Sequence, residues 1–518
     1  MLFSSSVVFV LFTRLLLISQ SNGARILVTG AVDSGTHIGS MVPMVKRLAS
    51  SGHQIVVLEI ATLKKARNLG TNVTVLFIPV PEDGGIAASL SASMFRVVSN
   101  GRILHLPYLF GDQKVHEYIL SHAPMFRSLL NTAFDLVILD ELFGVHSFAI
   151  AVHLNRHYGV PYIIYSTTMM IQSSAYSLAL GRNFVSEPNL LTSPPASSGD
   201  RYDPTNILDR LDNLNTVAWD LLRVKLHVES HLQSSLSSLR LFSVPNFAFS
   251  DFFSKASFVF ADYLDRVPAP LAESPSILPV SSHCGRARPL PSDLANFVSH
   301  FSSKGTIYVA FGTNLQWRYA PKGILNAFFG ALNRLVDYRI IFSFNNGIVP
   351  NNISVGTHIK LVTWAPQFDV LSHPATKLFI SHSGLKSFKE TLCTKVPAVY
   401  MPVYAEQSYN SKLALRFGFA TAVHKVTLDE EVLYSAIQKI LSNYSHFKDN
   451  ANRAHAFFLD RALDGMQMAE YGVRRALKEG GRGRRWKMTK GMDLDWFSYV
   501  HLDVAASFIA LALFLAKA

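Results

Sequence analysis

The sequence predicts an α/β protein with two Rossmann-like, doubly wound domains that face each other across a cleft. Short apolar runs of strand length alternate with amphipathic helical patterns from residue 25 onward and again from residue 305. Strands that alternate with helices form parallel sheets, whose ligands bind at the carboxyl ends of the strands. With 518 residues, the chain is also too long for one ordinary domain.

The first 23 residues have the composition of a secretory signal peptide. Apolar residues run from Val7 to Phe12 and from Leu15 to Ile18, and small polar residues precede an expected cleavage near residue 23. Three glycosylation triplets agree with a chain that enters the secretory pathway; they begin at Asn72, Asn352 and Asn443.

Residues 24–265 are expected to form the first domain. A strand from Arg25 to Gly30 is followed by a loop that presents His37. A later apolar strand begins at Phe134 and ends in an acid, Asp140. Because strand ends meet at one edge of a parallel sheet, we expect both side chains at the carboxyl edge.

The regular alternation is lost between residues 169 and 249, apart from a helix predicted over residues 207–239. An irregular insertion beside a cleft is a usual place for acceptor recognition, and the alternative is that it only covers the sheet. Residues 257–261 are predicted to be the last strand of this domain. A proline-rich linker is then expected over residues 266–300.

The second domain is expected over residues 301–478. Its first strand ends in a glycine turn that contains Gly312 and Thr313. Farther along, residues 361–410 contain three consecutive units of strand, polar loop and helix, so their loops open at one carboxyl edge. We expect a ligand at that edge.

The polar residues of this stretch suit a nucleotide sugar. The loop from Ser381 to Gly384, which contains His382, leads into a helix whose free amides can hold a phosphate. Lys386 and Ser387 lie in its first turn, and Glu390 lies one turn later, within reach of a ribose. Four further residues suit the base and the sugar hydroxyl groups: Trp364, for which a core position is the alternative, Gln367, Glu406 and Gln407.

The stretch resembles the donor-binding signature of the UDP-glycosyltransferases, the family that includes the UDP-glucuronosyltransferases. The matching residues keep that signature's spacing; they are Trp364, Pro366, Gln367, His373, Pro374, Phe379, His382, Gly384, Ser387, Glu390, Val396, Pro397, Pro402, Gln407 and Asn410. The resemblance implies a GT-B-like fold of the membrane-associated animal type, with the UDP-sugar in the second domain and the acceptor in the first. It also implies that Gly312 and Thr313 face the donor phosphates.

The chain departs from the family pattern at three positions, of which the first and third lie in the donor site. Lys386 stands where an asparagine is usual, Lys395 where a glycine is usual, and Glu406 where an aspartate is usual. Which UDP-sugar binds therefore stays open between glucose and glucuronic acid. The departures also motivate an alternative function, a non-catalytic relative that binds a UDP-sugar or a partner subunit.

His37 and Asp140 match the family's catalytic histidine and its aspartate partner. We expect His37 to deprotonate a hydroxyl group of a small lipophilic acceptor, while Asp140 fixes its tautomer. The attack would invert an α-linked donor to a β-glycoside. The UDP-sugar is expected as co-substrate without any cofactor or metal, because the Asp493 and Asp495 pair is the one DxD match and lies in the tail.

The end of the chain combines a basic segment, residues 479–503, with an apolar run, residues 504–518. As a helix this run would span roughly 20 Å, less than the core of about 30 Å of a bilayer. We expect a membrane anchor, with an interfacial tail as the alternative. The family resemblance places such an enzyme at the endoplasmic reticulum membrane, with its catalytic domains in the lumen.

Composition limits the remaining functions. The charges behind the net charge of +12 are scattered apart from the basic segment near the end, and no interleaving of aromatic and basic residues predicts nucleic-acid binding. Two cysteines are too few for a disulfide scaffold or an all-cysteine metal site, and Cys393 is expected to be a small buried hydrophobic residue. An oligomeric assembly is compatible with the sequence.

Overall fold

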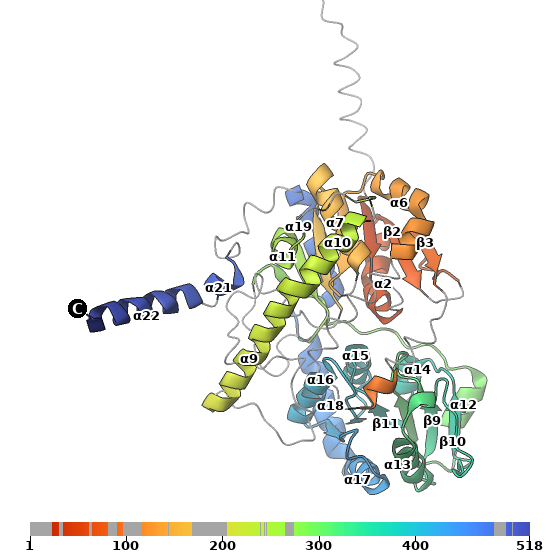
Figure 1. Cartoon of the computed structure of the whole chain (residues 1–518). Coiled ribbons are helices and arrows are strands. Elements are labelled where there is room, and N and C mark those ends of the chain that lie inside the picture. Colours follow the sequence, from red (N-terminus) through yellow and green to blue (C-terminus); the bar gives the residue numbers. More distant parts are fainter. Residues whose placement is uncertain are drawn as a thin grey trace, which may run out of the picture.

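In this computed structural model the protein folds into two α/β domains, which lie one above the other in Figure 1. The structure describes residues 23–30, 35–61, 65–80, 91–96, 116–142, 144–167, 205–238, 240–242, 244, 246–264, 274–480, 494–499 and 501–517. The predicted signal peptide up to residue 22, residues 169–204 of the predicted acceptor-recognition insertion and the basic cluster at 482–490 lie outside these residues.

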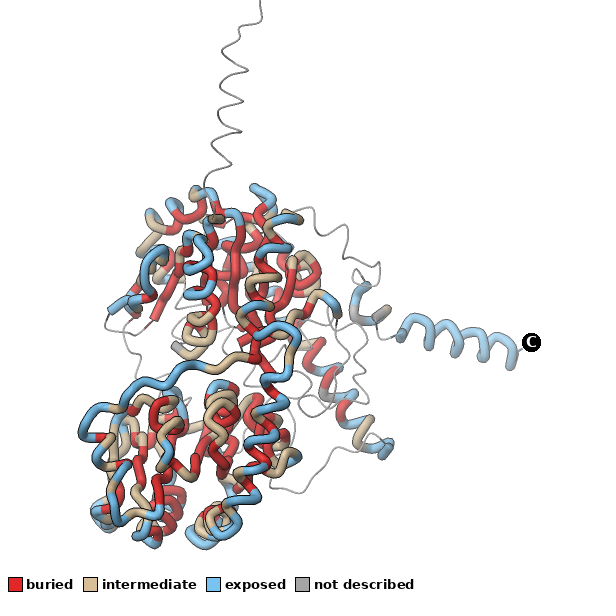
Figure 2. The backbone as a smooth tube through the Cα atoms, turned by 180° about the vertical axis from the view of Figure 1, so that it is seen from behind, coloured by how far each residue is buried: buried red, intermediate tan, exposed pale blue. Residues whose placement is uncertain are grey.

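The first domain is built on a seven-stranded parallel sheet in the order β3-β2-β1-β4-β5-β6-β7. Its strands are β1 (Arg25–Thr29), β2 (Gln54–Ala61), β3 (Val73–Pro79), β4 (Leu136–Asp140), β5 (Tyr162–Ser166), β6 (Phe258–Ala261) and β7 (Ile277–Pro279). The central strands are buried apolar runs, because helices cover both faces of such a sheet. Figure 2 shows these strands buried and the outer helices partly exposed.

The helices of the first domain follow the predicted alternation. They are α2 (Gly35–Ser50), α6 (Ala123–Leu130), α7 (Val145–Tyr158), α9 (Ile207–Arg223), the π-helical turn η2 (Val224–Val228), α10 (Glu229–Ser238) and α11 (Phe249–Lys255). The segments α9, η2 and α10 run on from one another, which confirms the long helix predicted over residues 207–239.

The second domain is built on a six-stranded parallel sheet in the order β10-β9-β8-β11-β12-β13. Its strands are β8 (Thr306–Ala310), β9 (Arg339–Ser343), β10 (Ile359–Val362), β11 (Thr376–Ser381), β12 (Ala398–Tyr400) and β13 (Ala420–Ala422). Its helical segments are α12 (Ser292–Val298), η3 (Trp317–Tyr319), α13 (Lys322–Asn333), α14 (Gln367–Ser372), α15 (Leu385–Thr394), α16 (Gln407–Phe417), α17 (Glu430–Leu441) and α18 (Tyr444–Leu459).

Both sheets reverse their strand order at an equivalent place. In the first sheet the reversal lies between β1 and β4, and in the second between β8 and β11. The chain leaves each of these neighbouring strands in opposite directions, which opens a crevice at the carboxyl edge. His37 and Asp140 flank the first crevice; Gly312 and His382 flank the second.

Helix α19 (Gly465–Glu479) crosses back from the second domain to the first. Its start is fixed by a capping box between Asp464 and Gln467. A Cβ on Gly472 would lie 2.5 Å from the Phe260 ring, so only glycine allows this close approach to β6. Glu470 then pairs with Arg47 of α2 at 2.9 Å.

Two sequence-based expectations about the region between the domains were wrong. Residues 257–261 are not the last strand of the first sheet, because β7 lies within the expected linker and pairs with β6. Cys393 is not a lone apolar residue: it forms a disulfide with Cys284, and their Cα atoms are 5.5 Å apart. The bond joins the segment after β7 to the end of α15.

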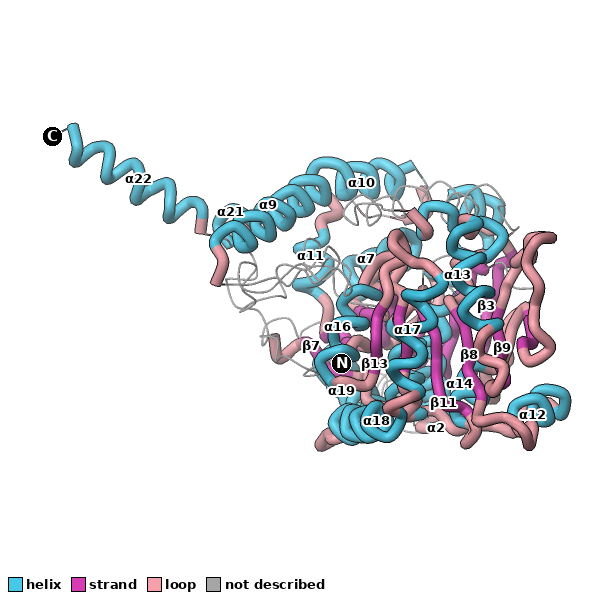
Figure 3. The backbone as a smooth tube through the Cα atoms, turned by 90° about the horizontal axis from the view of Figure 1, so that it is seen from below, coloured by secondary structure: helices cyan, strands magenta, loops and turns pink. Residues whose placement is uncertain are grey.

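The described part of the tail forms α21 (Trp496–Tyr499) and α22 (Leu502–Lys517). Helix α22 extends away from both domains, and its described side chains are exposed (Figures 1 and 3). Among the described residues, no helix has both the length and the apolar character needed to cross a membrane.

Candidate active site between the two domains

His37 and Asp140 meet at the crevice of the first sheet. His37 lies in the first turn of α2, directly after the β1 loop, and Asp140 is the last residue of β4. Because β1 and β4 are hydrogen-bonded neighbours, His37 Nδ1 lies 2.5 Å from Asp140 Oδ2. The other carboxylate oxygen accepts the Leu142 backbone N–H at 3.1 Å.

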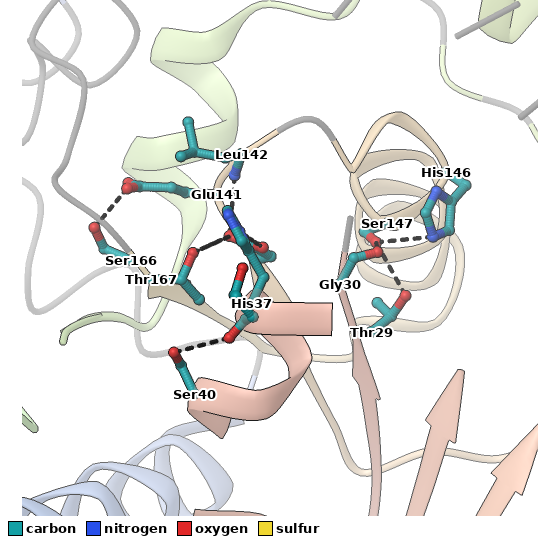
Figure 4. A network of polar contacts seen from close by, with 12 residues as sticks. Thr29, Gly30, His37, Ser40, Glu141, Leu142, His146, Ser147, Ser166 and Thr167 are labelled. Carbon is teal, nitrogen blue, oxygen red and sulfur yellow. Dashed lines mark hydrogen bonds and ion pairs between the residues drawn. The ribbon is translucent and has the colours of Figure 1, made fainter. Parts of the chain in front are cut away.

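Thr167 completes this group, although the sequence reasoning did not single it out. Its hydroxyl donates to Asp140 Oδ1 at 3.0 Å and lies 2.7 Å from His37 Nδ1 (Figure 4). Since the Thr167 hydroxyl proton goes to Asp140, the proton between these atoms belongs to His37 Nδ1. His37 Nδ1 donates it to Asp140 Oδ2 and to the Thr167 hydroxyl oxygen. The available signal was a hydroxyl residue directly after the predicted strand 161–166, at the same sheet edge.

The surroundings of His37 raise its pKa above that of an ordinary histidine. Burial lowers the pKa of His37, but the charge and hydrogen bond of Asp140 outweigh burial and leave it above the ordinary value of 6.5. Among the described residues no hydrogen bond engages Nε2, so this nitrogen keeps its lone pair in the neutral ring. The geometry is that of a general base held by a carboxylate.

A second polar network fixes the end of β1. Ser147, in the first turn of α7, donates to the Gly30 carbonyl at 3.2 Å and lies 3.0 Å from the Thr29 hydroxyl (Figure 4). The adjacent His146 is fully buried, and burial lowers its pKa to about 4, so the ring is neutral at physiological pH. These contacts anchor the strand from which the His37 loop departs.

The imidazole of His382 lies between two glycines at the crevice of the second sheet. A Cβ on Gly312 would lie 3.0 Å from His382 Nε2, and a Cβ on Gly384 would lie 2.6 Å from it. The glycines therefore make room for the ring. Burial lowers the pKa of His382 to about 4, so it offers hydrogen bonds and not positive charge.

Glu406 directly precedes α16, and its side chain lies at the start of α15, where the sequence predicted a phosphate. It is 6% exposed, and its Oε1 accepts the backbone N–H of Leu385, the first residue of the helix, at 3.1 Å. Burial raises the pKa of Glu406 above its ordinary value. One of the predicted phosphate-binding amides is thus held by a carboxylate, an arrangement that the sequence reasoning did not anticipate.

Gln407 supports the same loop. Its Oε1 accepts the backbone N–H groups of Val403 at 2.9 Å and Tyr404 at 3.1 Å. Its backbone carbonyl accepts the Ser383 hydroxyl at 2.7 Å. Among the described residues its side-chain nitrogen has no partner, so this donor is free to bind a ligand.

The remaining predicted donor residues form a second group beside α15. Gln367 Nε2 donates to Ser387 Oγ at 3.0 Å and to Glu390 Oε2 at 2.5 Å. Burial raises the pKa of Glu390 above its ordinary value. Trp364 is 69% exposed, so the alternative of a core position was wrong and its ring face is accessible.

Lys386 reaches from α15 toward the first domain. Its Nζ would lie 2.7 Å from a Cβ on Gly39, in the second turn of α2. Burial lowers the pKa of Lys386, and the charges of Glu390 and Asp262 oppose that effect. The residue forms no hydrogen bond or ion pair with any described residue, so its ammonium group is available between the domains.

A buried ion pair joins the domains next to this position. Lys389 Nζ lies 2.5 Å from Asp262 Oδ1, and their side chains are 12% and 3% exposed. Asp262 follows β6, whereas Lys389 belongs to α15. The Tyr165 hydroxyl contacts Asp262 and donates to the Ser40 carbonyl of α2 at 3.2 Å. This chain of contacts connects the predicted donor helix to the helix that carries His37.

The two groups of predicted residues therefore face each other. His37 is close enough to Glu406 and Lys386 for their charges to affect its pKa in opposite directions. Within the described ranges, no cluster of three or more histidine, cysteine or acidic residues could hold a metal ion. The site consists of a side-chain base on one domain and amides, carboxylates and a cation on the other.

Solved structures with the same two-domain fold are glycosyltransferases. A UDP-glucosyltransferase from Polygonum tinctorium has a TM-score of 0.55 and 14% identity, and the match covers 89% of this chain and all of that one. Phytolacca americana UGT2, solved with UDP-2-fluoro-glucose and pterostilbene, has a TM-score of 0.55 and 16% identity, with 87% and 99% covered. At these identities the match shows the fold, which is GT-B.

Two curated relatives match nearly the whole chain. UDP-glycosyltransferase UGT4 of Dactylopius coccus is 24% identical over 97% of this chain and 95% of its own length. Mouse UDP-glucuronosyltransferase 1A7 is 24% identical over 92% of this chain and 87% of its own. Residues 224–517 match the family described as UDP-glucoronosyl and UDP-glucosyl transferase. The chain therefore belongs to this family of UDP-sugar-dependent glycosyltransferases.

Proposed function

We propose that this enzyme transfers a hexosyl or glucuronosyl group from a UDP-sugar to a hydroxyl group of a small lipophilic acceptor, with inversion at the anomeric carbon. The observation that carries the proposal is the position of the His37 and Asp140 pair, which lies across the interdomain space from Glu406 and Lys386. A base and a donor site on opposite domains suit an in-line displacement.

His37 acts as the general base. Its Nε2 takes the proton of the acceptor hydroxyl while the acceptor oxygen bonds to the anomeric carbon. The bond between that carbon and the β-phosphate oxygen breaks, and UDP leaves with the electron pair. Asp140 stabilises the resulting imidazolium, because its carboxylate already lies 2.5 Å from Nδ1.

The donor is held by the second domain. Trp364 offers its exposed ring face to the uracil, and Gln367 and Glu390 bind the ribose. The start of α15 binds the diphosphate together with Thr313, Ser387 and a hydrogen bond from neutral His382. Glu406 and the free Gln407 amide bind sugar hydroxyl groups.

Lys386 supplies positive charge to the leaving diphosphate, so that no metal ion is needed. Its ammonium group has no partner among the described residues and lies between the helices α15 and α2. The same cation would accommodate a glucuronate carboxylate, whereas Glu406 suits a neutral hexose. The balance between the positive charge of Lys386 and the negative charge of Glu406 decides which UDP-sugar binds.

We also propose that the enzyme works in the lumen of the endoplasmic reticulum and is attached to its membrane by the tail. The asparagines of all three glycosylation triplets, Asn72, Asn352 and Asn443, are exposed. Digestion of the secreted or microsomal protein with an N-glycosidase should reduce its apparent mass, and carbonate extraction should leave the full chain in the membrane fraction. An unchanged mass and full release would contradict this location.

The test of the function is product analysis with purified protein. UDP-glucose and UDP-glucuronic acid are each supplied with a panel of phenols, and UDP release is measured. The expected product is a β-glycoside, recognised by its anomeric proton coupling in NMR. An α-glycoside would exclude inversion, and UDP binding without any transfer would favour the non-catalytic alternative.

A further inference from the structure

A short segment of the first domain is embedded in the second. Residues Ser91–Arg96 fall between β3 and α6 in the chain, yet Figure 1 shows them, in orange, among the elements of the second domain. Met94 and Phe95 are 2% and 4% exposed and belong to the hydrophobic core of the second domain. We call this segment the 91–96 clamp.

The clamp packs on the residues that follow β8. The Phe95 ring lies 6.1 Å from the Trp317 ring, centroid to centroid, and Trp317 in turn contacts Phe311 at 5.2 Å. The Ser91 hydroxyl accepts the Gln316 backbone N–H at 2.7 Å. Gly312 and Thr313, predicted to face the donor phosphates, lie in the same short stretch between β8 and η3.

The clamp also holds the residues that follow β12. Lys425 Nζ donates to the Met94 carbonyl at 2.6 Å and to the Val403 carbonyl at 2.5 Å. Val403 donates its backbone N–H to Gln407 Oε1. One lysine therefore joins a first-domain carbonyl to the loop that carries Glu406 and Gln407.

We infer that the 91–96 clamp positions both donor-binding loops, so that donor affinity in the second domain depends on a segment of the first. Two independent contacts meet at this segment: an apolar one to Trp317 and a polar one through Lys425. A loop that is fixed before binding loses less conformational freedom when it binds, so the clamp favours the donor. The inference rests on the proposed donor site but not on catalysis.

The alternative is that the clamp only adds apolar packing between the domains. Such packing would affect stability without changing the affinity of the donor site. Donor affinity and thermal stability must therefore be measured separately, on the full chain.

The test compares Phe95→Ala with Phe253→Ala. Phe253 is a matched control because it is also buried but belongs to α11 of the first domain, where its ring packs against Phe249 and Phe252. UDP affinity is measured by calorimetry and thermal stability by circular dichroism. Phe95→Ala should weaken UDP binding about tenfold, whereas Phe253→Ala should lower the melting temperature and leave UDP affinity within about twofold.

Lys425→Met is the second arm and keeps the inference testable if Phe95→Ala does not fold. It should weaken UDP binding about threefold to tenfold, because the Val403 carbonyl and the clamp are no longer joined. Unchanged UDP affinity in Lys425→Met and in folded Phe95→Ala would overturn the inference. Calorimetry measures UDP binding without turnover. The affinities can therefore be compared even if the protein does not catalyse the proposed transfer.

Discussion

The two crevices have the same topology but present different chemistry. In the first sheet the ends of β1 and β4 carry ionisable side chains, with His37 held by Asp140 and Thr167. In the second sheet the ends of β8 and β11 carry glycines and backbone amides around a neutral His382. On our proposal, one strand order gives a proton-transfer site in one domain and an anion-binding site in the other.

The difference also lies in what fixes each site. The first crevice is held by charge-assisted hydrogen bonds, which are short and directional. The second is held by close packing around glycines and by the network of Ser383, Gln407 and Asn410. Loss of a charge should therefore affect turnover, whereas added volume should affect donor binding.

Asp140→Asn should have the largest effect, because it removes the charge that holds His37. The rate kcat should fall about 100-fold or more. Wild-type activity should fall as pH drops through the His37 pKa, which lies above 6.5. In the variant, the charge of Asp140 no longer opposes the effect of burial, which lowers the pKa of His37, so the acidic limb of the kcat/KM profile should move to lower pH.

A pH–rate profile of the two proteins checks this prediction. Leu139→Val serves as the control, since it keeps the buried β4 strand and the carboxylate. If the acidic limb stays in place while the rate falls, Asp140 does not set the protonation of His37.

Gly384→Ala should have the next largest effect, and it acts on the other crevice. The backbone of Gly384 has a φ of −57°, which alanine adopts readily, but the new Cβ would lie 2.6 Å from His382 Nε2. Displacement of the ring should raise the donor KM about tenfold or more and change kcat less.

Gly323→Ala is the matched control, because nothing lies within 4 Å of its added Cβ and it is in α13. Donor saturation curves for both variants give the donor KM values that test this prediction. Equal donor KM values for the two would show that His382 does not contribute to donor binding.

Lys389→Met should have a smaller effect on turnover. The substitution changes how the two crevices are aligned, but it removes no proposed site residue from either crevice. It leaves the buried Asp262 carboxylate without its cation, which destabilises the closed arrangement. We expect kcat/KM to fall about threefold to tenfold.

The reversed pair, Asp262→Lys with Lys389→Asp, separates alignment from loss of charge. Recovery of part of the kcat/KM in the double variant would support an interdomain contact. A double variant that is worse than the two single changes combined would contradict it.

Reduction of the disulfide should change stability and leave turnover nearly unchanged. Cys284 and Cys393 are 109 residues apart, so the bond restricts the unfolded chain and its loss should cost about 2 to 4 kcal/mol of unfolding free energy. Chemical denaturation of wild type and Cys284→Ser with Cys393→Ser measures this. A large loss of donor affinity would instead place the bond in the donor site.

Much of the fold could be read from the sequence because buried parallel strands are apolar runs of the right length. The same pattern placed His37 and Asp140 at one edge, since Asp140 ends a strand and His37 follows the loop after another strand. The strand β7 was missed because its three residues, Ile277–Pro279, lie among prolines that read as a linker. The disulfide was missed because two distant cysteines carry no pairing signal.

The contacts that depend on how the domains meet could not be predicted. Thr167, the Lys389 and Asp262 pair and the 91–96 clamp all join residues far apart in the chain. The protonation of His382 could not be predicted either, since burial decides it and the sequence does not show burial. The local sequence pattern therefore located the candidate site residues, whereas their protonation depends on tertiary packing.

The central claim is that a base from one crevice serves a donor held in the other. The most direct measurement compares wild type with His37→Ala in two assays, transfer to a phenolic acceptor and UDP binding by calorimetry. We predict that transfer falls about 100-fold or more while UDP affinity stays within about twofold. Retained transfer by His37→Ala would contradict the account.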